Sequence, residues 1–141
     1  MSKKHRVAVY GTLRRGMGND RLLDDATFIG TDTLKDYGMV SLGGFPAIDE
    51  REGSDAVVEV YLVDDKQLHR LDMLEGCDGN DPCDNPDNFY SRQEVTLSSG
   101  TTAWVYFIPG ILEDYQGDSV LEGDWRAFME NHYVGRSQMR G

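Results

Sequence analysis

The residue best suited to acid–base chemistry is Glu75, at the end of a helical pattern over residues 65–75. At about 100° per residue, Glu75 projects within about 20° of Leu68 and about 40° of Leu71, toward the side that should face the core. Apolar surroundings and the negative end of the helix both disfavour a charged carboxylate, so the pKa of Glu75 should rise toward neutrality. Such a group is a good general acid or base near pH 7. The same pattern also allows an ordinary solvated glutamate at a frayed helix end.

A second chemical feature is the glycine-containing loop within VYGTLRRGMGN, residues 9–19. It follows an apolar run at residues 6–10 that predicts a buried strand. Glycine permits positive φ and has no Cβ, so this loop can direct backbone N–H groups at an oxygen-rich ligand. We therefore expect a binding loop whose reactive partner lies elsewhere in the chain.

The stretch GCDGNDPCDNPDNF, residues 76–89, contains both cysteines, Cys77 and Cys83. Two cysteines with this spacing fall short of a zinc site, and a cytosolic setting disfavours a structural disulfide, so we predict free thiols. The aspartates and asparagines of the stretch could bind calcium, but it lacks the glycine and closing glutamate of an EF-hand. A solvated, mobile loop is the simpler interpretation.

Strand and helix patterns alternate along the chain and predict an α+β fold to position these residues. Strand patterns cover residues 6–10, 27–34, 37–42, 56–63, 89–97 and 102–108. Helix patterns cover residues 19–26, 65–75 and 124–133. The glycine pair at 43–44 predicts a turn at the rim of the sheet, and SSGT at 98–101 predicts a hairpin.

Capping residues bound the predicted helices. Asp64 with Gln67 fits a capping box, and Gly76 fits the position just after a helix ends. Asn19 and Asp124 can cap the other two helices. The last helix has an apolar stripe typical of core packing rather than of a cofactor site, formed by Trp125, Phe128, Met129 and His132.

Two aromatic residues of the predicted hairpin bear on the site. On the strand at 89–97, Tyr90 shares a face with Arg92, and the pattern alone predicts a half-buried tyrosine and a solvated arginine. Tyr106, on the next strand, should face inward or pair across the hairpin. The function of all three residues stays open at this level.

Composition narrows the classes of protein. A length of 141 residues suits one domain with one core, and a net charge of −11 argues against a general nucleic-acid binder. The first residues show neither a signal-peptide pattern nor a run long enough to span a bilayer, so we predict a cytoplasmic protein with no membrane partner. No long apolar stripe is left over, which favours a monomer. Residues 136–141 should form a disordered tail.

Several motifs, in order over residues 7 to about 125, resemble the γ-glutamylcyclotransferase-like superfamily, which includes γ-glutamylamine cyclotransferases, AIG2-like proteins and a butirosin-pathway cyclotransferase. The motifs are VYGTLRRG, GGFPAI, VYLVDDKQLHRLDMLEG, YSRQEV and GDW. The resemblance implies a single domain over residues 1–141. Its fold would be α+β, a small mixed β-barrel-like sheet with flanking short helices and a cavity at one end.

The resemblance also implies an activity, in which a γ-glutamyl amine or amide is cyclised to 5-oxoproline and the amine is released. The family's catalytic glutamate falls on Glu75, and its later tyrosine, Tyr90, would close over the bound glutamyl group. Its binding loop would hold the glutamyl carboxylate and amide oxygen through the backbone N–H groups of Tyr10, Gly11, Thr12 and Leu13. No metal or organic cofactor is expected, and a small molecule is the expected partner.

Two departures from the family pattern matter. Val58 stands where the family usually has glycine, and it would either narrow the floor of the cavity or fill the core. The link between Glu75 and Tyr90 is long and could act as a lid, so the amine remains open among an amino acid, a lysine side chain, a polyamine and an antibiotic precursor. A hydrolase that uses Glu75 to activate water, and a non-catalytic binding module, are the rival hypotheses.

Overall fold

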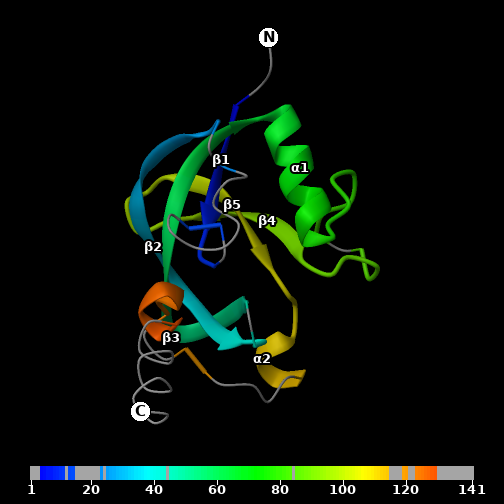
Figure 1. Cartoon of the computed structure of the whole chain (residues 1–141). Coiled ribbons are helices and arrows are strands. Elements are labelled where there is room, and N and C mark those ends of the chain that lie inside the picture. The colour runs from blue at the N-terminus through cyan, green and yellow to red at the C-terminus, as the bar shows by residue number, and fades with distance from the viewer. Residues whose placement is uncertain are drawn as a thin grey trace, which may run out of the picture.

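The computed structural model describes residues 4–11, 13–14, 23, 25–43, 45–83, 85–114, 119–120 and 123–129. Its strands form one five-stranded mixed sheet in the order β2-β3-β1-β5-β4 (Figure 1). The first strand, β1 (Lys4–Val9), runs parallel to β5 (Thr102–Phe107) and antiparallel to β3 (Pro46–Asp64). The outer strands β2 (Thr27–Ser41) and β4 (Ser91–Thr96) pair antiparallel with β3 and β5. The prediction of an α+β fold is confirmed.

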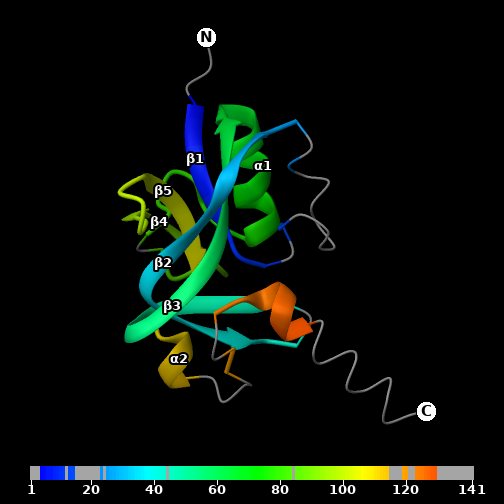
Figure 2. The ribbon, with the colours of Figure 1, turned by 90° about the vertical axis from the view of Figure 1, so that its left-hand side faces the viewer.

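A long bent hairpin of β2 and β3 shapes the molecule. The two separate strands predicted at 27–34 and 37–42 are one strand, interrupted by a register shift at Asp36, which has φ of 64°. The Asp36 carboxylate accepts the backbone N–H of Gly53 at 3.0 Å, which holds the irregular segment of β3 to β2. Beyond this point both strands cross the lower end of the molecule (Figure 2).

The sheet curls back on itself at that end. The backbone N–H of Ile108, just after β5, donates to the carbonyl of Ile48 in β3 at 3.1 Å. The start of β3 is thereby brought beside the end of β5, and the cavity described below lies against it. This curl agrees with the barrel-like sheet that the resemblance implies.

The helix α1 (Asp65–Glu75) begins and ends where the sequence predicts. Asp64 and Gln67 exchange both hydrogen bonds of a capping box, each at 2.8 Å. Gly76 has φ of 66° and donates its backbone N–H to the last turn, a conformation that a side chain would strain. Because both ends of α1 are fixed, the face of the helix from which Glu75 projects is fixed as well.

The core has two clusters, one on each face of β1. Val7 and Val9 pack in the cluster under α1, whereas Ala8 faces the other cluster, as expected from the alternation of a strand. Val58 is fully buried in the second of these clusters and does not line the cavity. The departure at Val58 therefore fills the core and does not narrow the floor of the cavity.

The remaining elements are short. Helix α2 (Ile111–Asp114) follows β5, and a helical segment occupies residues 125–129. Asp124 caps that segment as predicted, accepting the Ala127 N–H at 3.2 Å, and Trp125 is fully buried and stacked on Phe128. His132, the tail 136–141 and most of the predicted helix 19–26 lie outside the described residues.

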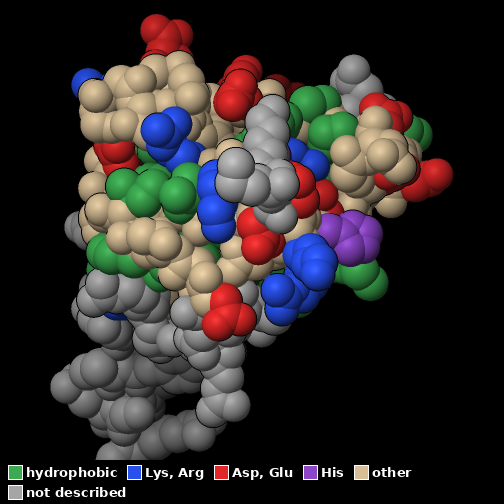
Figure 3. All heavy atoms as spheres, turned by 90° about the horizontal axis from the view of Figure 1, so that it is seen from above, with side chains coloured by type: hydrophobic (Ala, Val, Ile, Leu, Met, Phe, Trp, Pro, Cys, Tyr) green, Lys and Arg blue, Asp and Glu red, His purple; other side chains and the backbone are tan. Residues whose placement is uncertain are grey.

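The surface carries charges of both signs. In the view from above, acidic and basic side chains are interspersed and form no single large basic area (Figure 3). None of the helices in the described ranges combines the length and the apolar character needed to cross a bilayer.

Candidate active site

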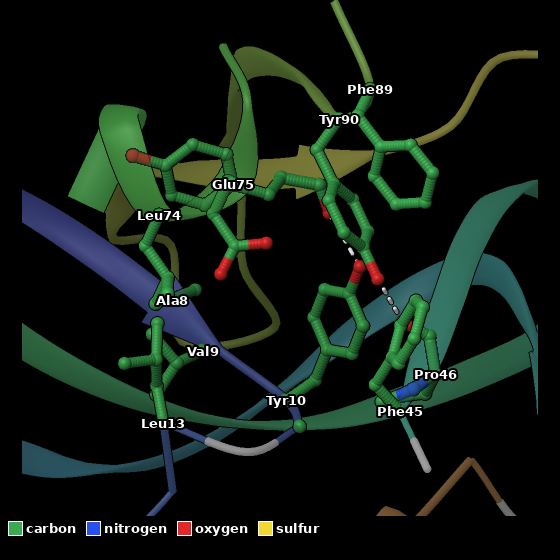
Figure 4. Close-up of a pocket in the computed structure, with 12 residues that line it drawn as sticks. Ala8, Val9, Tyr10, Leu13, Phe45, Pro46, Leu74, Glu75, Phe89 and Tyr90 are labelled. Atoms are coloured by element: carbon green, nitrogen blue, oxygen red, sulfur yellow. Dashed lines mark hydrogen bonds between the residues drawn. The ribbon is translucent and has the colours of Figure 1, made fainter. Parts of the chain in front are cut away.

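A cavity of about 360 Å³ opens where the end of β1, the start of β3 and the end of α1 meet (Figure 4). Twelve described residues line it: Ala8, Val9, Tyr10, Gly11, Leu13, Phe45, Pro46, Leu74, Glu75, Phe89, Tyr90 and Tyr106. The cavity thus brings together Glu75, Tyr90 and three of the four predicted loop residues. The fourth, Thr12, lies outside the described residues.

Glu75 directs its carboxylate into this cavity from the last turn of α1 (Figure 4). Burial raises the pKa of Glu75 from 4.5 to about 7, because the apolar walls disfavour the charged form. The sequence-based prediction of a raised pKa is therefore confirmed, with burial as its cause. Leu74, expected on the apolar side of the helix, is instead 44% exposed at the mouth of the cavity.

Three tyrosines form much of the cavity wall and are held by hydrogen bonds. The Tyr10 hydroxyl donates to the backbone carbonyl of Tyr106 at 2.8 Å, and the Tyr90 hydroxyl donates to the carbonyl of Pro46 at 2.6 Å. Burial is the main cause that raises the pKa of Tyr10, Tyr90 and Tyr106, and the negative charge of Glu75 adds to it at all three. At Tyr106 the hydrogen-bonded carboxylate of Asp72 contributes more than Glu75 does. All three phenols stay neutral at pH 7 and present a rigid wall around the carboxylate.

Behind this wall lies a buried ion pair that the sequence analysis missed. Arg92 is only 4% exposed and binds Asp72 through two hydrogen bonds, of 2.8 and 3.0 Å. The same carboxylate accepts the Tyr106 hydroxyl at 2.6 Å, and the guanidinium lies 4.4 Å from the centre of the Trp104 ring. The prediction of a solvated Arg92 is therefore wrong. Asp72 lies on the buried side of α1, four positions after Leu68. A buried carboxylate needs a cation as its partner, so this position was the feature of the sequence that could have indicated the ion pair.

The loop after β1 is anchored by a second buried network. Arg14 is 5% exposed, and its guanidinium binds Glu59 of β3 at 3.0 Å and Asp124 at 2.8 Å. Arg126 adds a contact to Glu59 at 3.3 Å. Three motifs that are far apart in the sequence, at the YGTLRR loop, at β3 and at GDW, therefore meet at one point.

The need for glycine at position 11 comes from close packing of this position against Pro46. A Cβ on Gly11 would lie 2.8 Å from two atoms of the Pro46 ring, closer than atoms can pack. The N–H of Arg14 donates to the Gly11 carbonyl at 3.0 Å and is not available to a ligand. Within the described part of the chain, the backbone N–H groups of Gly11 and Leu13 donate to no protein acceptor.

The loop at 76–89 is tied down at both ends beside the cavity. The N–H groups of Phe89 and Tyr90 donate to the carbonyls of Gly76 and Glu75, at 2.9 and 3.1 Å. Within the loop, the Asn88 side chain accepts the Asp78 N–H at 2.7 Å. These bonds hold Phe89 next to Glu75.

The two cysteines of this loop are free thiols, as predicted. Burial raises the pKa of Cys77 to about 11, which makes its thiol unreactive at neutral pH. Among the described residues, no group of three or more His, Cys, Asp or Glu side chains could hold a metal ion.

A half-buried carboxylate in a mostly apolar cavity next to a tight glycine loop is the arrangement expected of an acid–base enzyme for small molecules. Residues 7–127 match the family described as gamma-glutamyl cyclotransferase, AIG2-like, and the chain belongs to this family.

Known relatives agree with this assignment. The protein MJ1514 of Methanocaldococcus jannaschii, provisionally named a gamma-glutamylcyclotransferase, is 38% identical over 79% of this chain and 98% of its own length. The gamma-L-glutamyl-butirosin B gamma-glutamyl cyclotransferase of Niallia circulans is 32% identical over 90% of this chain and 79% of its own length. The crystal structure of an uncharacterized protein of Pyrococcus horikoshii superposes with a TM-score of 0.71 at 27% identity, covering 92% of this chain and 97% of that one.

Proposed function

We propose that this protein converts a γ-glutamyl amine or amide to 5-oxoproline and a free amine, with Glu75 as the general acid and base. The observation that carries the proposal is a carboxyl group with a pKa of about 7 at the wall of the cavity beside the 10–13 loop. A group with this pKa takes up and returns a proton at neutral pH with little energetic penalty either way. Membership of the cyclotransferase family supports the reaction type.

In the first step, Glu75 accepts a proton from the α-ammonium group of the glutamyl moiety. The freed amine then attacks the γ-carbonyl carbon of the same molecule, forming the C–N bond of a five-membered ring. Because both groups are held in one cavity, the attack is intramolecular and its entropic cost is small. The product of this step is a tetrahedral oxyanion.

The oxyanion needs donors that are already in place. The N–H groups of Gly11 and Leu13 are suited to this role, because neither has an acceptor among the described residues. The bond to the leaving nitrogen then breaks, and protonated Glu75 supplies the proton that the amine needs. The ring nitrogen then gives its second proton to the Glu75 carboxylate, which passes it to the released amine, so the amine leaves as an ammonium ion. No water is consumed, and Glu75 ends as the carboxylate that began the cycle.

Tyr10, Leu13 and Tyr90 would enclose the glutamyl chain. Tyr90 covers the cavity next to Glu75, and its hydroxyl is fixed on the Pro46 carbonyl. Described lining residues include no arginine or lysine, so backbone N–H groups are the donors on hand for the glutamyl carboxylate. Main-chain donors suit this role, because they can orient the carboxylate of the substrate without placing a cation beside Glu75.

The test compares wild type with Glu75→Gln on a panel of γ-glutamyl amines and dipeptides, following 5-oxoproline and free glutamate by mass spectrometry. Glutamine keeps the shape and loses the proton acceptor, so oxoproline formation should fall by about 10²- to 10⁴-fold. Glu94→Gln, at an exposed position of β4, is the matched control and should retain wild-type turnover.

The same assay separates the rival hypotheses. Glutamate in place of oxoproline would indicate a hydrolase. Saturable binding with neither product would indicate a binding module. Equal turnover by Glu75→Gln and wild type would exclude Glu75 as the general base.

A further inference from the structure

The mouth of the cavity is formed by three large apolar side chains that are exposed to solvent. Leu74, Phe45 and Phe89 are 44%, 38% and 55% exposed, and all three line the cavity that contains Glu75. They come from α1, from the turn before β3 and from the end of the 76–89 loop. Apolar surface concentrated at the rim of a site indicates contact with an apolar part of the ligand.

Both phenylalanines stand on the same side of Glu75, beside Tyr90 (Figure 4). The Phe89 ring packs edge-on against Tyr90 at 5.2 Å between ring centres, and Phe45 lies 6.2 Å from Phe89. The Phe89 backbone is fixed by its hydrogen bond to Gly76 at 2.9 Å. An aromatic surface held in this way needs little ordering when a ligand binds.

The charges of the cavity argue in the same direction. Glu75 is the single charged residue among the described residues that line it, and the reaction requires Glu75 to change its protonation state. The substrate already brings the α-ammonium group of its glutamyl part to Glu75. If the leaving amine carried a further ammonium group, that group would lie among apolar side chains at the mouth, with no other described lining carboxylate to pair with. Partial desolvation of that cation against the apolar side chains would oppose binding.

We propose that the amine released by this protein carries an aromatic or branched aliphatic group, which packs against Phe45 and Phe89 at the mouth of the cavity. This inference rests on the proposed cyclotransferase function. The α-amine must reach Glu75, so the glutamyl part occupies the inner cavity. The leaving nitrogen then points toward the mouth, and its substituent meets the two rings.

The test measures kcat/KM for the γ-glutamyl amides of methylamine, isobutylamine, 2-phenylethylamine and 1,4-diaminobutane. We expect the phenylethyl and isobutyl amides to exceed the methyl amide by about 10-fold or more, because a well-fitted apolar group gains contact area. The diaminobutane amide should be the poorest of the longer substrates. Preference for the diaminobutane amide, or equal rates for all four, would overturn the inference.

Variants of the mouth make the test specific. Phe89→Ala and Phe45→Ala should lower the ratio of the phenylethyl to the methyl rate by about 10-fold. The matched control is Phe28→Ala on β2, a phenylalanine with the same 38% exposure as Phe45 but away from the cavity, which should keep the wild-type ratio. An unchanged ratio in both mouth variants would overturn the inference.

The two proposals fail in different ways. Oxoproline from the methyl or diaminobutane amide, with no preference for apolar groups, would leave the cyclotransferase function standing and refute the role of the mouth. Absence of oxoproline from these four amides and from the dipeptides of the first panel would refute the cyclotransferase function and this inference with it. Oxoproline from the dipeptides alone would refute only the inference.

Discussion

At the residue scale, the raised pKa of Glu75 follows from the position of its carboxylate, which the last turn of α1 directs into the cavity. Burial is the dominant cause of the raised pKa, and no cation lines the cavity among the described residues to oppose it. Arg92, which lies behind the cavity wall, is paired with Asp72 through two hydrogen bonds. The raised pKa of Glu75 therefore reflects burial without an offsetting cation among the described residues that line the cavity.

Glu75→Gln should change stability in a pH-dependent manner. The folded protein holds the Glu75 proton up to about pH 7, whereas the unfolded chain releases it near 4.5, so wild type loses stability as the pH rises between these values. Glutamine is neutral throughout. We expect the variant to match wild type near pH 4.5 and to exceed its unfolding free energy by about 1 to 3 kcal/mol at pH 8.

Urea unfolding at pH values from 5 to 8 measures this difference. The exposed Glu94→Gln variant provides the control, since its difference from wild type should stay nearly constant over the same range. A difference for Glu75→Gln that does not grow with pH would show that the carboxylate is not penalised by burial.

At the element scale, local patterns predicted the elements better than they predicted the contacts between them. The limits of α1 follow from Asp64, Gln67 and Gly76, which all act within one helix, and so could be predicted from the sequence. The inward direction of Glu75 follows from the same helix geometry. The burial of Arg92 could not be predicted in this way, because a period of two gives only the face of the strand on which Arg92 lies. It does not reveal the Asp72 carboxylate, 20 residues away in sequence, whose charge makes the burial of an arginine possible.

The anchoring of the 10–14 loop to β3 gives a prediction at this scale. Arg14→Leu leaves the buried carboxylate of Glu59 without its closest arginine, so the unfolding free energy should fall by about 3 kcal/mol. Oxoproline formation should fall as well, because the loop loses its attachment to β3. Urea unfolding and the oxoproline assay measure the two effects.

A double variant separates the ion pair from general damage. Glu59→Leu combined with Arg14→Leu removes both charges, and much of the lost stability should return if the cause is the buried Glu59 charge, which keeps Arg126 but lacks Arg14. Arg70→Leu, at an exposed position of α1, should change the unfolding free energy by less than about 0.5 kcal/mol. A double variant less stable than Arg14→Leu would show that shape, not charge, holds the loop.

At the scale of the whole molecule, the curl of the sheet assembles a site from segments that no local pattern connects. Residues 10–11, 45–46 and 106 line one cavity because β3 bends at its register shift and returns beside the end of β5. The family resemblance predicted that Glu75, Tyr90 and the loop at 10–13 share one site, but it did not predict that residues 45–46 and Tyr106 line the cavity. Periodicity and composition could not predict this assembly, because the bend depends on the pairing of Asp36 with Gly53 across two strands.

The contact between Gly11 and Pro46 tests this assembly. Gly11→Ala places a Cβ 2.8 Å from two Pro46 ring atoms, so the loop and the start of β3 must move apart. We expect a loss of about 1 to 3 kcal/mol in unfolding free energy and a marked fall in oxoproline formation. Pro46→Ala in the same chain removes the colliding atoms and should restore part of both. The matched control is Gly30→Ala in β2, where an added Cβ meets nothing within 4 Å. If Gly30→Ala and Gly11→Ala were equally stable and active, the approach of these two segments would not be what sets the geometry of the site.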